Sequence, residues 1–171
     1  MKAQALATSP EFYKGYIELA EDKPLLTQLE SGGIAPYVDA LDELKAYGLQ
    51  TYAEGKWTVN EIIQHLIDSE RIFMNRALRI ARQDKTEMPG YDHDAYVPVS
   101  RANEIPLESL LEEYQLLRLS SYHFFKNLNE AQLLSTGSAN GVTFSVLSIG
   151  YILIGHPTHH FNVIKERYLG Q

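Results

Sequence analysis

Residues 57–62, Trp57-Thr58-Val59-Asn60-Glu61-Ile62, form the clearest helix start in the sequence. The Thr58 hydroxyl can accept the Glu61 N–H while the Glu61 carboxylate reaches back to the Thr58 N–H, which is the reciprocal arrangement of a capping box. Apolar residues then recur at helical spacing as far as about Gln83, which predicts a long helix with one apolar face.

Helical periodicity extends along the rest of the chain, whereas strand signals are weak. The other predicted helical segments are residues 10–20, an interrupted stretch over 24–47, residues 106–128 and residues 143–169. Ser31-Gly32-Gly33 interrupts the second of these, and we expect its pieces and the first segment to form one broken helix. Residues 129–141 are predicted to be a connection with at most a short turn. Four amphipathic helices in one small chain predict an all-α four-helix bundle.

The connection over residues 84–105 is long and polar and contains Pro89, Gly90 and Pro98. Long connections inside compact domains are uncommon and are often functional. This one permits a bundle with a long crossover connection in place of a simple up-and-down order. We find no repeat, low-complexity segment or linker, and we expect residues 1–171 to form a single domain.

Composition and charge exclude several classes of function. The 171 residues carry 15 Lys and Arg against 22 Asp and Glu, a formal net charge of −7, which disfavours binding to nucleic acid or to an anionic membrane. The absence of cysteine excludes disulfides, thiolate ligands and a protein thiol nucleophile. Residues 1–10 lack the apolar segment of a signal peptide, and the apolar run over 142–154 is shorter than the roughly 20 residues of a membrane span. We therefore expect a cytoplasmic protein.

Three of the six histidines lie close together near the end of the chain. His156 and His160 are four residues apart and share one face of a helix, so they can bind one ion. His65, close to the capped helix start, is the third ligand that we expect. Imidazole suits transition metals, and we expect one divalent ion, zinc or nickel first, with iron or manganese as alternatives. Three protein ligands leave a coordination position open, which is typical of catalytic sites.

The sequence leaves alternatives to this metal site open. The pair His156 and His160 can also be polar residues at an ordinary helix end, and His159 is the next candidate ligand. Pro157 lies between the pair and biases the preceding residue away from helical geometry, so it can aim His156 inward or spoil the pairing. His93 is expected in a solvated loop, and His123 on the surface.

Two charged residues fall on apolar helix faces. Glu70 lies in the apolar stripe of the helix that starts at Thr58, and Arg118 lies on the inward side of residues 106–128. Because a lone buried charge is costly and a pair is tolerated, we expect the two side chains to meet. We interpret them first as a structural ion pair and second as catalytic candidates, with Arg118 holding an anionic group and Glu70 orienting it. Tyr91 and Asp92 in the long connection can close over the metal or serve as ordinary loop residues.

Three segments together resemble the DinB/YfiT-like superfamily. They are WTVNEIIQHLIDSER at 57–71, PGYDHDAYV at 89–97 and GHPTHHFNVIKERYL at 155–169. The resemblance covers almost the whole chain and implies a four-helix bundle, an open site with His65, His156 and His160 as metal ligands, and a homodimer. Pro157 departs from the pattern, since a helix-forming residue is more usual there.

The resemblance also limits the possible functions. Characterised members include transferases and isomerases that use glutathione, mycothiol or bacillithiol, and others are described as metal-dependent hydrolases. We therefore expect a metal-dependent enzyme acting on a small molecule, either a hydrolase or a thiol-dependent S-transferase with a low-molecular-weight thiol as co-substrate. The alternative is a non-catalytic metal-binding or stress-related bundle.

Overall fold

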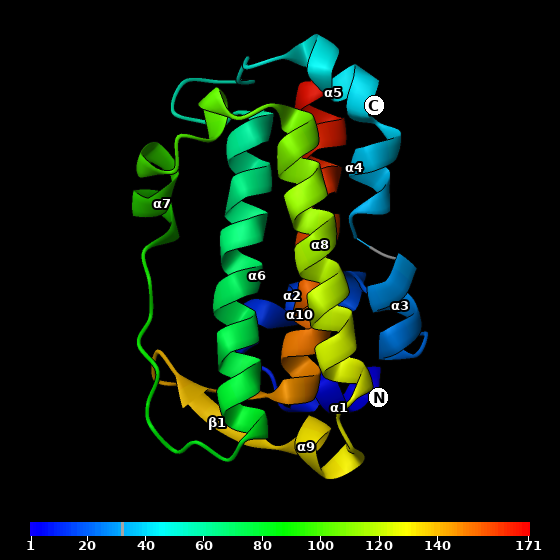
Figure 1. The fold of residues 1–171 in the computed structure, drawn as a ribbon, viewed down its shortest axis with the longest axis vertical. Helices are drawn as coiled ribbons and strands as arrows, with labels where there is room; N and C mark the ends of the chain where they lie inside the picture. The colour runs from blue at the N-terminus through cyan, green and yellow to red at the C-terminus, as the bar shows by residue number, and fades with distance from the viewer. Residues whose placement is uncertain (32) are drawn as a thin grey trace.

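The computed structural model describes residues 1–31 and 33–171, so the predicted break at Ser31-Gly32-Gly33 lies partly outside the described residues. Most of this chain is helical (Figure 1). The α-helices are α1 (Lys2–Ala7), α2 (Glu11–Leu19), α3 (Leu25–Ser31), α4 (Ala35–Asp39), α5 (Leu41–Tyr47), α6 (Val59–Ala81), α7 (His93–Tyr96), α8 (Leu107–Lys126), α9 (Glu130–Leu134) and α10 (Val146–Val163). The remaining elements are the strands β1 (Thr136–Ala139) and β2 (Val142–Ser145), the short 3-10 turns η1 (Val97–Val99) and η2 (Ala102–Glu104), and a final π-helical turn η3 (Ile164–Tyr168).

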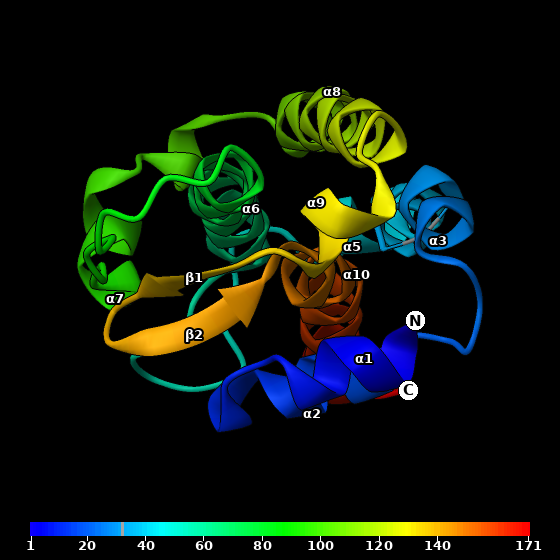
Figure 2. The ribbon, with the colours of Figure 1, turned by 90° about the horizontal axis from the view of Figure 1, so that it is seen from below.

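The four-helix bundle is built from α6, α8, α10 and a broken fourth helix made of α3, α4 and α5. The helices α6 and α8 run in the same direction, while α10 runs in the opposite direction between them and the N-terminal helices (Figures 1 and 2). Helix α6 begins with the predicted capping box, in which Thr58 Oγ1 accepts the Glu61 N–H at 3.2 Å and Glu61 Oε2 accepts the Thr58 N–H at 2.8 Å. The predicted bundle and its best-marked helix start are therefore confirmed.

Helix α2 does not join the broken helix, contrary to the prediction, and packs instead against α10. A glycine makes this close approach possible. A Cβ atom at Gly155 would lie 1.7 Å from the Tyr16 backbone oxygen, so any larger residue would force the two helices apart. Contact with α10 brings the side chains of α2 up to the inner face of the bundle.

A β-hairpin precedes α10, and the sequence prediction missed it. Strands β1 and β2 are antiparallel and are joined by Asn140 and Gly141, which have φ angles of 53° and 72°. Positive φ at both positions is the requirement of the tightest hairpin turns, and Asn-Gly is the dipeptide that best provides it. The last helix consequently begins at Val146 and not at residue 143 as predicted, with Ser145 and Ser148 forming its capping box.

The connection between α6 and α8 runs the length of the bundle because these two helices are parallel (Figure 1). Its lower part is fixed to the hairpin by two backbone hydrogen bonds, from Met88 N to Ser138 O at 3.2 Å and from Asn140 N to Met88 O at 2.8 Å. Its upper part contains α7, η1 and η2, which pack along α6. The predicted crossover thus exists, and it places residues of the connection beside the inner face of α6.

The core consists of two apolar clusters with a buried polar layer between them. One cluster gathers α1, α2, α3, the C-terminal half of α6 and most of α10, and the other gathers α4, α5 and the N-terminal halves of α6 and α8. The buried polar residues at the middle level are Ser69, Glu70, Arg118, Ser121 and His156. No helix of the described chain is both long enough and apolar enough to cross a bilayer.

Candidate metal centre

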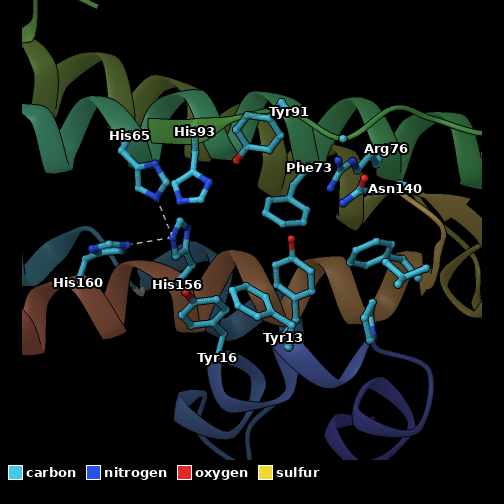
Figure 3. A pocket seen from close by; sticks show the side chains of 16 residues that line it. Tyr13, Tyr16, His65, Phe73, Arg76, Tyr91, His93, Asn140, His156 and His160 are labelled. Atoms are coloured by element: carbon cyan, nitrogen blue, oxygen red, sulfur yellow. Dashed lines mark hydrogen bonds between the residues drawn. The ribbon is translucent and has the colours of Figure 1, made fainter. Parts of the chain in front are cut away.

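Three imidazole rings from two helices converge on one point at the inner face of the bundle. His65 projects from α6, and His156 and His160 project from consecutive turns of α10 (Figure 3). The Nε2 atom of His156 lies 3.2 Å from Nε2 of His65 and 3.1 Å from Nε2 of His160. Ligand atoms from all three side chains lie within 4.8 Å of one another. The three histidines singled out by their spacing in the sequence are therefore neighbours in space.

These distances suit a shared metal ion better than hydrogen bonding alone. A tetrahedral zinc ion with Zn–N bonds of 2.0–2.1 Å separates its ligand nitrogens by about 3.3 Å. In a neutral imidazole, each nitrogen carries either one proton or one lone pair in the ring plane. The Nε2 atom of His156 therefore cannot form well-aligned hydrogen bonds with both of its neighbours at once, whereas a cation can accept a lone pair from each ring.

Aromatic side chains hold the three rings in place. The Trp57 ring centroid lies 4.9 Å from that of His65, and the Tyr16 ring lies 5.1 Å from His156. His65 and His156 are each only 8% exposed, and His160 is half-buried. Trp57 precedes the cap of α6 and Tyr16 lies at the close contact with α10, so the same features that fix the helices also orient these ligands.

Burial keeps the three imidazoles neutral. Burial, and to a lesser extent the neighbouring His93, lowers the pKa of His65 to about 4. Burial and the nearby His65 lower the pKa of His160 to about 3, and burial together with His160 and His65 lowers the pKa of His156 well below its ordinary value. Neutral rings are the form that binds metals, so the site is ready for a cation at neutral pH.

These pKa values predict that the metal-free protein is sensitive to acid. Because the folded pKa of His65, about 4, lies below the ordinary value of 6.5, the unfolded chain binds protons that the folded chain excludes. Stability is therefore complete above about pH 6.5 and falls as the pH is lowered towards 4, by at most about 1.4 kcal/mol per pH unit for each such histidine. Urea unfolding in the presence of a chelator at pH 7, 6 and 5 measures this slope.

A matched pair of variants separates the site from general acid effects. His65→Phe removes a buried titrating group and should flatten the slope, whereas His123→Phe, at an exposed position, should leave it unchanged. An equal slope in all three proteins would show that the buried histidines do not control the acid sensitivity.

A cavity of about 450 Å³ opens beside the three histidines. His65, His156 and His160 form one end of it, and Arg76 and Asn140 lie at the other end (Figure 3). The walls between the two ends are mainly aromatic: Phe12, Tyr13, Tyr16, Phe73, Tyr91 and Phe144. A ligand in this cavity would contact the three histidines with one group and lie between aromatic rings with the rest of its length.

Glu70 and Arg118 meet, as predicted. Arg118 Nε lies 3.1 Å from both carboxylate oxygens of Glu70, Arg118 Nη2 lies 2.7 Å from Glu70 Oε2, and the Ser121 hydroxyl donates to Glu70 Oε1 at 2.6 Å. The two charged side chains are 1% and 5% exposed, and neither is among the residues that line the histidine cavity. Their position favours the structural interpretation of the pair, and a catalytic role for either stays a prediction.

Pro157 does not break α10, and the expected displacement of His156 from helical geometry is wrong. A proline lacks the N–H that would bond to the carbonyl four residues earlier, which here is that of Leu153. Arg118 Nη2 donates to the Leu153 oxygen at 2.7 Å and replaces the missing bond, while the Tyr37 hydroxyl donates to the Pro157 oxygen at 2.7 Å. The helix therefore continues through the proline, and His156 and His160 keep their pairing.

Residues of the connection and of α2 lie at the site; Tyr91 is one of the alternatives that the sequence offers there, whereas Tyr16 is not. His93 is exposed in the connection, as expected, but its ring also lies 5.5 Å from that of His65, which the sequence did not predict. The Tyr91 hydroxyl lies 3.0 Å from Ser69 Oγ, at the cavity wall. Asp92 points elsewhere and caps α7 by accepting the Ala95 N–H at 3.1 Å. His159 packs edge-to-face with Tyr16 beside the cluster and is not one of its three members.

Comparison with known proteins agrees with this architecture. The profile of the DinB superfamily matches residues 27–164. Among solved structures, YfiT from Bacillus subtilis, described as a probable metal-dependent hydrolase with an unusual four-helix bundle topology, is similar with a TM-score of 0.73. The sequences are 21% identical, and the similarity covers 90% of this chain and 96% of that one. No curated protein matches the sequence.

Proposed function

The chain belongs to the DinB superfamily, and from this membership and the histidine geometry we propose that it is a metal-dependent hydrolase of small molecules. His65, His156 and His160 would hold one divalent transition metal, and the substrate would occupy the adjoining cavity. The observation that carries the proposal is the convergence of three neutral imidazoles at the end of a cavity large enough for a small molecule.

The donor set defines the metal site that we propose. Three imidazole nitrogens suit zinc or nickel, with iron or manganese as alternatives, and they leave room for further ligands. When bound, such an ion supplies Lewis acidity, which activates water and polarises the carbonyl or phosphoryl oxygen of the substrate. The role of the protein is to keep three lone pairs directed at one point and to keep bulk water away from it.

The surrounding residues support a reaction on a bound small molecule. Trp57 and Tyr16 fix the rings of His65 and His156, so the ligand set does not have to be assembled when a metal arrives. The aromatic walls would bind the apolar part of a substrate and displace water from the cavity. His93, half-exposed and beside His65, lies where a side chain could exchange a proton with solvent.

Hydrolysis is favoured over thiol transfer by the description of YfiT as a probable metal-dependent hydrolase. A thiol-dependent S-transfer would need a low-molecular-weight co-substrate, since the chain contains no cysteine. The two reactions share the metal and the cavity and differ in the nucleophile.

A screen of chromogenic esters, amides and phosphate esters with zinc- and nickel-loaded protein tests the proposal. We expect native protein to turn over at least one class of substrate above background. The rate should be at least about 100-fold lower in His160→Ala, which loses one of the three proposed ligands, and unchanged in His123→Ala, because His123 is not one of them. Turnover that requires added glutathione or a similar thiol would identify a transferase instead. Metal binding without turnover on any class would favour the non-catalytic alternative.

A further inference from the structure

Arg76 lies at the end of the cavity opposite the histidines, and neither the metal site nor the ion pair of the core uses it (Figure 3). It follows His65 by eleven residues on α6, which places the two on nearly the same helix face and roughly 16 Å apart along the axis. Arg76 is 4% exposed, so its charge is buried in the wall of a cavity.

Arg76 differs from the other buried arginine in its surroundings. Arg118 is equally buried, at 4% exposure, and meets the Glu70 carboxylate through two of its nitrogens. Across residues 1–31 and 33–171, no carboxylate lies within ion-pair distance of Arg76. A buried cation without an anion is costly, and proteins normally retain one only when something compensates the charge.

The contacts around Arg76 compensate its charge only in part. Its guanidinium carbon lies 5.4 Å, 5.9 Å and 5.7 Å from the ring centroids of Phe73, Tyr91 and Phe144, which are cation–π distances. In the described part of the chain, its side chain makes one hydrogen bond, from Nη2 to the Pro89 oxygen at 3.3 Å. A guanidinium has five N–H donors in a planar fork, so donors remain for a ligand in the cavity.

We propose that Arg76 binds the carboxylate of a small, largely apolar ligand whose other end lies at the three histidines. The aromatic walls would contact the apolar middle of this ligand, and the Asn140 side chain, which lies beside Arg76, would add a polar contact at the carboxylate end (Figure 3). The position of the reacting end rests on the proposed function, whereas the carboxylate site rests on Arg76 alone.

A carboxylate fits this end better than a phosphate. Arg76 is the only arginine or lysine among the residues lining the cavity in the described chain. One guanidinium matches the charge and the planar, two-oxygen geometry of one carboxylate. A phosphate monoester carries close to two negative charges at neutral pH and would leave one of them without a partner in a cavity with apolar walls.

Such a site would select substrates by a group remote from the reaction. Contacts with a non-reacting carboxylate hold the opposite end of a ligand in one position, which is how binding energy is used to orient a reacting bond. A ligand of matching length is therefore expected to present its reactive bond to the histidine end when Arg76 holds its carboxylate.

Calorimetric titration with 4-phenylbutyrate and its neutral analogue 4-phenylbutanamide tests the carboxylate site without any turnover. We expect native protein to bind the carboxylate at least about tenfold more tightly than the amide, because the difference is one charge-assisted interaction in a buried place. Arg76→Met should abolish this preference. Arg82→Met removes the same charge at an exposed position near the end of the same helix and should retain the preference.

Thermal unfolding distinguishes a ligand site from a structural arginine. If Arg76 awaits an anion, Arg76→Met removes a buried charge that is compensated only in part, and the variant should unfold at the same temperature as native protein or higher. Phenylbutyrate should raise the unfolding temperature of native protein and of Arg82→Met but not that of Arg76→Met. Arg76→Lys keeps the charge without the planar fork and should bind the carboxylate more weakly than native protein does.

Two results would overturn the assignment of an anion site to Arg76. One is equal affinity of native protein for the acid and the amide. The other is a carboxylate preference that survives in Arg76→Met and disappears in His160→Ala, since this would place the carboxylate at the histidines. Metal content is measured on the same preparations. Protein that binds phenylbutyrate through Arg76 but binds no metal would refute the proposed hydrolase function and leave the carboxylate site standing. Tighter binding of phenyl phosphate than of phenylbutyrate would overturn the choice of carboxylate.

Discussion

Replacing His156 with alanine should abolish metal binding. His156 occupies the centre of the cluster, with its Nε2 atom 3.1 Å and 3.2 Å from those of its two partners, so its loss leaves two ligands on different helices. Removing a partner that merely supports a ligand lowers metal affinity by about 10–100-fold, and losing a ligand should cost on the order of 100-fold or more. Elemental mass spectrometry of the untagged protein should show about one metal per chain in native protein and almost none in the variant.

His159→Ala is the matched control for this experiment. His159 lies on the same helix and packs edge-to-face with Tyr16, but it is not part of the three-histidine cluster. The control should retain its metal. Loss of metal from His159→Ala together with retention in His156→Ala would reassign the ligands.

Breaking the buried ion pair should have the largest effect on stability. Glu70→Met leaves the Arg118 guanidinium buried without its carboxylate, and Arg118→Met leaves the Glu70 carboxylate without its cation and the Leu153 oxygen without its Arg118 donor. Each single change should lower the free energy of unfolding by about 3–5 kcal/mol, as expected when one partner of a buried pair is removed. Urea unfolding at neutral pH measures the loss.

The double variant Glu70→Met/Arg118→Met shows which part of this loss comes from the charges. With both charges removed, most of the stability should return, apart from about 1–3 kcal/mol for the unsatisfied Leu153 carbonyl. The exposed pair Arg71 and Glu113 also joins α6 to α8, so Arg71→Met is a matched control that should cost less than about 1 kcal/mol. A loss of less than about 1 kcal/mol in the free energy of unfolding of Glu70→Met or Arg118→Met would contradict a stabilising role of the pair.

The sequence predicts the parts of this protein that depend on local chemistry. The start of α6 follows from one capping box, and the helical pairing of His156 and His160 follows from their spacing. The Asn140-Gly141 dipeptide is an equally local signal and would have revealed the hairpin. His65 is expected as the third ligand from its place near the capped start of α6, and the family resemblance implies the same residue. Homodimeric assembly, a cytoplasmic location and a single domain over the whole chain stay predictions.

Other features depend on contacts between distant segments and leave no local pattern. Helix α10 survives Pro157 because a side chain 35 residues earlier in the chain donates to the carbonyl that the proline leaves free. His93 and Tyr91 reach the site because α6 and α8 are parallel, which makes their connection pass the histidines. The sequence pattern does not single out Arg76, which is distinguished by its aromatic surroundings in three dimensions.

The close contact of α2 with α10 at Gly155 divides the site between two parts of the chain. The histidines lie within residues 27–164, which the superfamily profile matches, whereas Phe12, Tyr13 and Tyr16 lie before that range. The histidine end of the cavity thus lies within the matched bundle, whereas one wall is contributed by α2, which lies before the matched range. Relatives that keep the same three histidines are therefore expected to differ in substrate choice through the segment that corresponds to α2, since its side chains form part of the cavity wall.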